Sequence, residues 1–400
     1  MTQPADTAPP ATDNGRRRRL IDHHATMWRI RAFERAAEDG LAAGHVNGAV
    51  HMSIGQEAVP TGVAAHLITE DVIASTHRGH GHSIAKGADL NGMMLELFGR
   101  AGGACAGKGG SMHIADFKVG MLGANGVVGA GLPIAVGAAQ GLRLLGRAAI
   151  AVCYFGDGAA NRGPFLESLN WAAVFKLPVL FVCEDNNWSA TTRTATMSAG
   201  PGIAARSEAL GVPALSIDGN DVEAVDEAAG RLIGLIRGGS GPPAACPHLS
   251  AEGPHRHRCR PYRPADEVAA RWEDDPIARN AAELKALGLD DDEIAAIEVA
   301  ETARIAASVT AALAAPLPDT AAAFDDVQDI GRPRPGAEQG QAWSTHGAMG
   351  GIWAWIGGRS YERFHLYRGR PAGAGRGTGA RPPGLGAGRR PGPRRRVQAV

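Results

Sequence analysis

The sequence predicts an α/β fold with a mostly parallel sheet flanked by helices. Apolar strand-like runs and helical runs alternate along most of the chain, which is typical of parallel strands joined by helices. The clearest case lies at 148–183, where two uncharged apolar runs, 148–155 and 179–183, enclose a helix-length segment. Strands buried on both faces give continuous apolar runs of this kind. These observations predict a strand–helix–strand crossover.

Composition limits the class of protein. The chain has 400 residues, is 44% hydrophobic and carries no formal net charge, so it can bury a large core and has no global basic character for nucleic acid. It has an odd number of cysteines, and Cys153 and Cys183 fall in the predicted buried strands, which favours a reducing compartment. Because no apolar run approaches 18 residues and no signal-type segment follows the N-terminal arginines, we expect no membrane span and a cytoplasmic location.

The first third of the chain is predicted to be largely helical. Residues 1–18 are expected to form a disordered tail. Apolar residues such as Met27, Ile30 and Phe33 then recur at helical spacing across 19–43. The next expected elements are a helix at 58–67, a short strand at 71–75, a helix at 90–98, a glycine-rich loop region at 99–129 and a small-residue helix at 132–145.

After the crossover, the alternation continues. Residues 188–211 are rich in Ser, Thr, Ala and Gly and are predicted to be mobile. A strand and turn are expected at 214–219, followed by helices at 221–237, 266–287 and 290–313. The last helix starts at Asp290 with three acidic residues, which favour a helix N-terminus. We therefore place the folded domain at 19–327 and expect 328–400 to be a poorly structured tail rich in Gly, Pro and Arg.

The crossover carries the strongest functional signal. Gly156-Asp157-Gly158 follows its first strand and Asn186 follows its second, and Pro164 sits where the helix would begin. A right-handed crossover brings both strand ends to one sheet edge, where α/β proteins bind ligands. A carboxylate and a carboxamide are hard oxygen ligands that suit Mg²⁺ or Ca²⁺. The pair predicts a metal–diphosphate site, against the alternative of two turns without a ligand.

Four other segments carry motifs in a fixed order, and Tyr262-Arg263-Pro264 and Asp275-Pro276-Ile277 follow them. The four are His51-Met52-Ser53-Ile54-Gly55-Gln56-Glu57, Thr76-His77-Arg78-Gly79-His80-Gly81, Gly107-Lys108-Gly109-Gly110-Ser111-Met112-His113 and Gly123-Ala124-Asn125-Gly126-Val127-Val128-Gly129. With the crossover, they resemble the α subunit of the E1 component of 2-oxo acid dehydrogenase complexes, of the pyruvate or acetoin type. The resemblance extends from residue 19 to about residue 327.

This resemblance implies a thiamine diphosphate-binding fold with thiamine diphosphate and Mg²⁺ as cofactors. The side chains of Asp157 and Asn186 and the backbone carbonyl of Trp188 would ligate the metal. A guanidinium and N–H groups at a helix start suit the diphosphate. The residues implied to bind cofactor are His77, Arg78, Gly126, Val128, Gly156, Asp157, Gly158, Ala159, Asn186 and Trp188. His51 resembles a catalytic histidine that faces the substrate as a proton donor or oxyanion partner.

The resemblance also implies a reaction and partners. The reaction is oxidative decarboxylation of a 2-oxo acid such as pyruvate, or cleavage of acetoin, with acyl transfer to the lipoamide of the E2 acyltransferase. In this family, the glutamate that activates the cofactor comes from a domain of a β subunit. Only one α/β domain is found at 19–327, so the chain is expected to be inactive alone and to work as an α₂β₂ heterotetramer that binds the lipoyl domain of E2.

One segment departs from the family pattern. The family has a Gly-His-Thr or Gly-His-Ser loop nine residues before the Tyr-Arg-Pro, but Gly253 is followed here by Pro254 and then His255. Codons such as GGG-CCA-CAC-CGT-CAC-CGA-TGC-CGC encode this stretch, and one base later they give Gly-His-Thr-Val-Thr-Asp-Ala. We hypothesise two compensating frameshifts. As written, His255 could take the catalytic role only with a shifted loop, and the alternative is a catalytically impaired homologue with a structural or regulatory role.

Several other segments allow more than one interpretation. Cys246, His248 and the 253–261 run offer zinc ligands at spacings of no standard pattern. The histidines of 77–82 suggest a metal site, although anion-binding and packing roles are favoured near a diphosphate. The run 102–108 fits a phosphate loop but lacks its Ser/Thr and a preceding strand. The Arg-rich C-terminal tail allows a nucleic-acid arm, disorder or another shifted frame. Two polar residues of the crossover helix are expected on its surface or at a subunit contact: Glu167 and Asn170.

Overall fold

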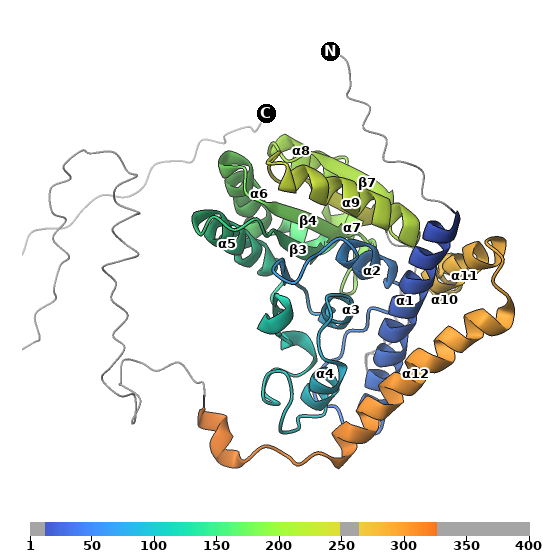
Figure 1. Ribbon diagram of the computed structural model, residues 1–400. Helices are drawn as coiled ribbons and strands as arrows, with labels where there is room; N and C mark the ends of the chain where they lie inside the picture. Colours follow the sequence, from blue (N-terminus) through green and yellow to red (C-terminus); the bar gives the residue numbers. More distant parts are fainter. Residues whose placement is uncertain (1–12, 249–263, 326–400) are drawn as a thin grey trace, which may run out of the picture. The chain divides into compact units, whose positions relative to one another are not determined.

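The computed structural model describes residues 13–248 and 264–325 (Figure 1). The chain divides into two compact units, 1–326 and 327–400, and the second lies outside the described residues. Within the described part, no helix is both long and apolar enough to cross a membrane. The predicted disordered tail 1–18 is wrong for its last six residues, because the first helix already begins at Asp13.

The core is a six-stranded sheet in the order β2-β1-β3-β4-β8-β7. All of its neighbouring strands are parallel, which confirms the predicted α/β fold. Its strands are β1 (Val72–Ala74), β2 (Met121–Gly123), β3 (Ala151–Gly156), β4 (Val179–Glu184), β7 (Ala214–Asp218) and β8 (Ala244–His248). A separate antiparallel pair is formed by β5 (Trp188–Ser189) and β6 (Thr192–Arg193).

The predicted crossover is confirmed as β3–α6–β4. Gly156 at the end of β3 is in register with Glu184 at the end of β4, so the two strands finish level. Helix α6 (Gly163–Phe175) has Pro164 in its first turn and ends at Lys176, which adopts a left-handed conformation. Because the strand ends are level, Asp157 and Asn186 emerge at the same edge of the sheet.

Helices cover both faces of the sheet (Figure 1). Alternate β3 residues such as Cys153 and Phe155 pack against α5 (Gly131–Leu144), α6 and α8 (Ile203–Ala209). The intervening residues, including Val152 and Tyr154, pack against α2 (Ala58–Ala64) and α9 (Val222–Arg237). The thiols of Cys153 and Cys183 are buried in these strands, as expected.

A helical layer lies beside the sheet. The long helices α1 (Asp13–Ala42) and α12 (Asp291–Ala314) run side by side and share a core with α4 (Leu90–Leu97). Helix α12 begins with a capping box formed by Asp290 and Glu293, which confirms the predicted acidic start. The remaining helices are α3 (Gly79–Ala85), α7 (Thr194–Met197), α10 (Ala265–Arg271) and α11 (Pro276–Ala286).

Several elements differ from the sequence prediction. Residues 13–18 are helical because Arg16 pairs with Glu223 of α9 and Glu283 of α11, which local composition does not reveal. The single helix predicted at 266–287 is two helices, since Pro276 starts the second. Strand β8 was not predicted; its Pro247 pairs with β7 beyond the stretch where β8 contacts β4.

The two segments predicted as irregular contain regular structure. The glycine-rich region 99–129 includes strand β2 and two short 3₁₀ helices, Ser111–His113 and Phe117–Val119. The segment 188–211 contains the β5–β6 pair, α7 and α8. Helix α3 was missed because glycines lower helix propensity. Its glycines are needed for packing, since a Cβ at Gly79 would lie 2.6 Å from the Cβ of Ala124.

Candidate active site

A cavity of about 430 Å³ lies at the carboxyl edge of the sheet, where β1, β3 and β4 end. It brings together every predicted site residue of the described part, although these come from segments far apart in the sequence. They are His51, His77, Arg78, Gly126, Val128, Gly156, Asp157, Gly158, Ala159, Asn186 and Trp188. Their individual roles stay predictions. His255 lies outside the described residues, as do the 253–261 run of the zinc hypothesis and the C-terminal tail.

Asp157 is positioned as the first residue after β3 and is 2% exposed. Its Oδ1 accepts a hydrogen bond from the N–H of Gly158 at 2.8 Å, and the Thr194 hydroxyl donates to Oδ2. Burial raises the pKa of Asp157 to about 6, the two hydrogen bonds oppose this, and the nearby Asp185 carboxylate raises it further. This environment penalises the bare anion, so a bound cation would stabilise it.

Asn186 and Trp188 lie just beyond β4. The side-chain oxygen of Asn186 accepts a hydrogen bond from the N–H of Trp188 at 3.0 Å, which forms a tight turn at the strand end. The indole of Trp188 donates to Glu267 of α10 at 3.2 Å and lies 4.6 Å from the Arg193 guanidinium. The turn that carries the predicted metal ligands is therefore braced by α10 and by the β5–β6 pair.

Gly158 lies in close contact with the β5–β6 pair. A Cβ at this position would stand 2.2 Å from Ser189 Oγ and 2.6 Å from Ser189 Cβ, so a larger residue does not fit. Gly158 and Ala159 belong to the first turn of a 3₁₀ helix, Asp157–Asn161. The first N–H groups of a helix lack intrahelical acceptors and can bind an anion.

Three basic side chains from two other segments line the cavity. The rings of His51 and His77 meet edge to face, with centroids 4.8 Å apart. Arg78, which is 9% exposed, donates from Nη1 to the Met52 carbonyl at 2.5 Å. Arg78 therefore holds the segment that carries His51 and also provides a cation at the cavity wall.

His80 and His82 have packing roles. His80 Nδ1 is 2.9 Å from Glu34 Oε2, and its Nε2 is 3.0 Å from Ser111 Oγ. His82 bridges Ser75 and Glu184, at 2.8 and 3.2 Å. Both rings thus use both nitrogens inside the protein. Across 13–248 and 264–325, no three His, Cys, Asp or Glu side chains gather as a metal cluster.

The cavity residues that the sequence prediction missed include Ser75, Tyr154 and Glu184. Ser75 directly follows β1, and the other two lie in the last three residues of β3 and β4. His82 contacts all three: it forms hydrogen bonds with Ser75 and Glu184, and its ring stacks on that of Tyr154 with centroids 3.8 Å apart. Their placement at strand ends was the signal that could have identified them.

The glycine-rich loop at 105–110 is organised by one buried carboxylate, Glu96. Its two oxygens accept hydrogen bonds at 2.7 to 3.1 Å from the backbone N–H groups of Cys105, Gly107, Gly109 and Gly110. Gly107 and Gly110 have φ of +76° and +61°, which favours glycine. Because these amides face a carboxylate of the protein, they are not a phosphate loop. The loop instead delivers Met112 to the cavity.

Comparisons with known proteins decide the family. The family model for the dehydrogenase E1 component matches residues 25–321. The chain belongs to this family. It is 41% identical over 302 residues to the α subunit of acetoin:2,6-dichlorophenolindophenol oxidoreductase from Bacillus subtilis (strain 168), covering 75% of this chain and 91% of the relative. The family prediction made from the motifs is thus confirmed.

Other relatives agree. The corresponding α subunit from Cupriavidus necator is 40% identical over 317 residues, covering 77% of this chain and 93% of the relative. The pyruvate dehydrogenase E1 component subunit alpha of Rhizobium meliloti is 36% identical over 305 residues, covering 75% and 87%. The family implies thiamine diphosphate as cofactor. The alternative of a catalytically impaired homologue receives no support from these similarities.

Proposed function

We propose that this chain is the α subunit of an E1 dehydrogenase that acts on acetoin or a 2-oxo acid such as pyruvate, with thiamine diphosphate and Mg²⁺ as cofactors. The observation that carries the proposal is that one cavity at the sheet edge contains all the predicted cofactor-binding residues of the described part. The E1 relatives, acetoin and pyruvate types alike, support the same assignment.

The residues present fit a metal–diphosphate group. The buried Asp157 carboxylate, whose pKa is raised to about 6 chiefly by burial, is suited to a divalent cation. Asn186 and the carbonyl of Trp188 would complete the protein's share of the ligands. Arg78 and the N–H groups of Gly158 and Ala159 would hold the diphosphate, and the backbones of Gly126 and Val128 would contact the aminopyrimidine. When bound, thiamine diphosphate supplies a nucleophilic carbon and an electron sink for carbonyl cleavage.

The protein's own groups bind, orient and move protons. His51 lies in the cavity against His77, where it would donate a proton or a hydrogen bond to the oxygen of the substrate carbonyl. Its imidazole is suited to this role because a ring N–H can donate to a carbonyl oxygen. The acyl group would then pass to lipoamide, so the acceptor is a disulfide on the lipoyl domain of E2.

We also propose that a β subunit completes the active site, in an α₂β₂ assembly. An exposed apolar surface on α5 and α6 supports this: Ile134, Leu166, Trp171 and Val174 are 44 to 66% exposed. No atom lies within 4 Å of a Cβ built at Gly137 or Gly141 of α5. Because these glycines have no side chains, another helix could approach the backbone of α5 closely there. Glu167 and Asn170 are exposed on α6, as predicted for surface or subunit-contact residues. Patches of this kind mark protein interfaces.

The test is co-expression with the β subunit of an E1 dehydrogenase. We expect dye reduction that depends on acetoin or on a 2-oxo acid, on thiamine diphosphate and on Mg²⁺, and that is absent for either subunit alone. Comparing acetoin, pyruvate and branched-chain 2-oxo acids would identify the substrate. An assembly that binds the cofactor but reduces no dye would instead favour the impaired-homologue alternative.

A cytoplasmic location, supported by the buried thiols of Cys153 and Cys183, is part of the same proposal.

A further inference from the structure

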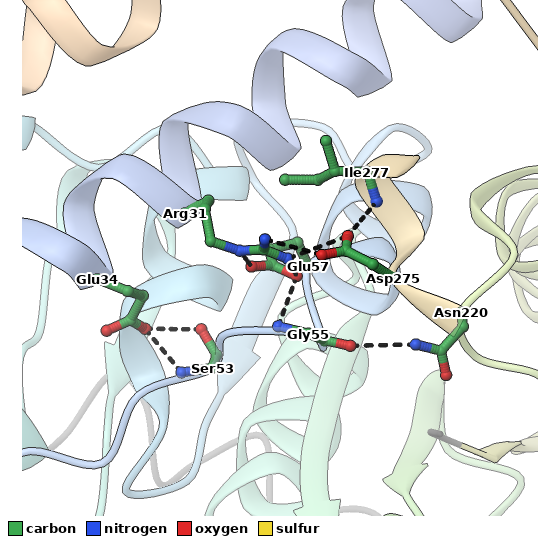
Figure 2. Close-up of polar contacts among 8 residues, drawn as sticks. All are labelled: Arg31, Glu34, Ser53, Gly55, Glu57, Asn220, Asp275 and Ile277. Atoms are coloured by element: carbon green, nitrogen blue, oxygen red, sulfur yellow. Dashed lines mark hydrogen bonds and ion pairs between the residues drawn. The ribbon is translucent and has the colours of Figure 1, made fainter. Parts of the chain in front are cut away.

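The segment 51–57 carries two cavity residues, His51 and Gln56, yet forms no helix or strand. Its backbone is fixed by buried side chains instead (Figure 2). Glu34 Oε1 accepts hydrogen bonds from the N–H and the hydroxyl of Ser53, at 3.0 and 2.7 Å. These two bonds anchor the middle of the segment to α1.

Gly55 is held on both sides. Its N–H donates to Glu57 Oε2 at 2.8 Å, and its carbonyl accepts from the side-chain amide of Asn220 at 3.2 Å (Figure 2). Gly55 has φ of +86°, a conformation that glycine adopts at little cost. The position of the segment therefore depends on where the Glu57 carboxylate is held.

Glu57 is held by Arg31, which is also bound to Asp275. Arg31 Nε donates to Glu57 Oε1, and Nη2 lies 3.0 Å from Glu57 Oε2. The same guanidinium reaches Asp275 with Nη1–Oδ2 and Nη2–Oδ1 distances of 3.0 and 3.3 Å. The side chains of Arg31, Glu57 and Asp275 are only 4%, 0% and 13% exposed. Water does not compete freely for these contacts, so their geometry is well defined.

Asp275 also fixes its own helix. Its Oδ1 accepts a hydrogen bond from the N–H of Ile277 at 2.8 Å and so caps the N-terminus of α11 (Figure 2). The ring of Trp272, three residues earlier, lies 5.6 Å from the Arg31 guanidinium. The Asp275-Pro276-Ile277 motif thus connects the start of α11 to the loop beneath His51.

We propose that Asp275, acting through Arg31 and Glu57, is a positioning residue that sets the placement of His51 in the cavity. Arg31 binds both carboxylates at once, so it transmits the position of Asp275, at the start of α11, to Glu57. The inference rests on the proposed function, because it treats His51 as a group that touches substrate.

The chain offers a matched control. Arg29, on the same helix α1, forms a similar two-bond ion pair with Glu301 of α12, at 2.8 and 2.9 Å. The Glu301 side chain is 8% exposed, so this pair is also largely buried. Among the described residues, Arg29 forms its ion pair with Glu301, which also pairs with Arg304, and neither of these pairs reaches the 51–57 segment. Asp275→Asn and Glu301→Gln each neutralise one carboxylate that joins α1 to the C-terminal helices, but only the first is connected to the loop.

Hydrogen exchange of the full chain measures the loop directly. Asp275→Asn keeps an oxygen that can cap α11, but it removes the carboxylate charge and so weakens the hydrogen bonds to the Arg31 guanidinium. We expect exchange of a peptide that contains Ser53 and Gly55 to accelerate about tenfold, the effect of turning a charge-assisted hydrogen bond into a neutral one. Glu301→Gln should leave that peptide unchanged. Equal exchange in Asp275→Asn and the wild type, or equal acceleration in both variants, would overturn the proposal.

Activity with the β subunit tests whether the effect passes through His51. Asp275→Asn should lower kcat about tenfold in the otherwise native chain and cause no further loss in a His51→Ala background, whereas Glu301→Gln should have no effect in either. Losses that multiply independently would show a general structural defect and refute the positioning role. An inactive wild-type assembly would refute the proposed function. The exchange result would still show whether Asp275 positions the 51–57 segment.

Discussion

The β3–α6–β4 crossover and the 51–57 segment contribute to the same cavity in different ways. In the crossover, the local sequence defines two buried strands, a helix start at Pro164 and a level register, and Asp157 is placed by the end of β3. The 51–57 segment has no regular structure and is held by buried side chains, one of which depends on Asp275, 244 positions from Arg31. The metal–diphosphate half of the site is therefore set by secondary structure, and the His51 half by tertiary contacts.

The largest effect is expected on the crossover side, from Asp157→Ala. Removing the buried carboxylate removes the predicted anionic ligand of Mg²⁺, so Mg²⁺-dependent binding of thiamine diphosphate should be lost. Calorimetric titration of the assembly with its β subunit measures this, with Glu227→Gln on the exposed face of α9 as the control. Unchanged affinity in Asp157→Ala would refute the metal role.

Gly158→Ala should weaken cofactor binding next. Its Cβ would stand 2.2 Å from Ser189 Oγ, so the 3₁₀ turn or the β5–β6 pair must shift. Ser189→Gly in the same chain should restore part of the affinity. Gly234→Ala, at a position with open space in α9, is the control and should bind cofactor normally. Equal affinity in Gly158→Ala and the control would show that the close contact does not matter.

Glu96→Gln tests the side-chain-held part of the molecule. The amide keeps one oxygen but presents N–H₂ where two backbone donors now find a carboxylate oxygen, so the free energy of unfolding should fall by about 2–3 kcal/mol. Urea titration of the full chain measures this change in the free energy of unfolding. A change below about 0.5 kcal/mol, typical of surface substitutions, would contradict the assigned role.

The smallest effect concerns how the stability of the α1–α11 packing depends on pH. This packing holds Arg31 of α1 beside Asp275 at the start of α11. Burial lowers the pKa of His24 from 6.5 to about 4, and its ring contacts Asn280 of α11 at 3.1 Å. The folded state favours neutral His24, so this stabilisation is present above pH 6.5 and is lost as the pH falls toward 4. Between pH 7 and 5 the free energy of unfolding should drop by about 2 kcal/mol from this group.

Urea titrations at the two pH values measure the drop, and His24→Asn should reduce it. The exposed His45 provides the control, because His45→Asn should keep the wild-type pH dependence. An identical pH profile for wild type and His24→Asn would remove His24 from the account.

The sequence predicted the crossover and its site because each step has a local signal: uncharged apolar strands, a glycine pair around Asp157 and a proline at the helix start. It did not predict that Glu96 collects four backbone N–H groups, since a single acidic residue in a helix looks like any surface charge. Arg31 and Asp275 likewise carry no mark of their pairing, because only the fold brings α1 and α11 together. Residues 13–18 were misjudged for the same reason.

Titration of the wild-type assembly with thiamine diphosphate, in Mg²⁺ and in excess chelator, tests the central claim most directly. If the cavity is the cofactor site of an E1 α subunit, calorimetry should show saturable binding in Mg²⁺ that is lost in chelator and returns when Mg²⁺ is restored. No binding in Mg²⁺, or equal binding with and without the metal, would contradict the account.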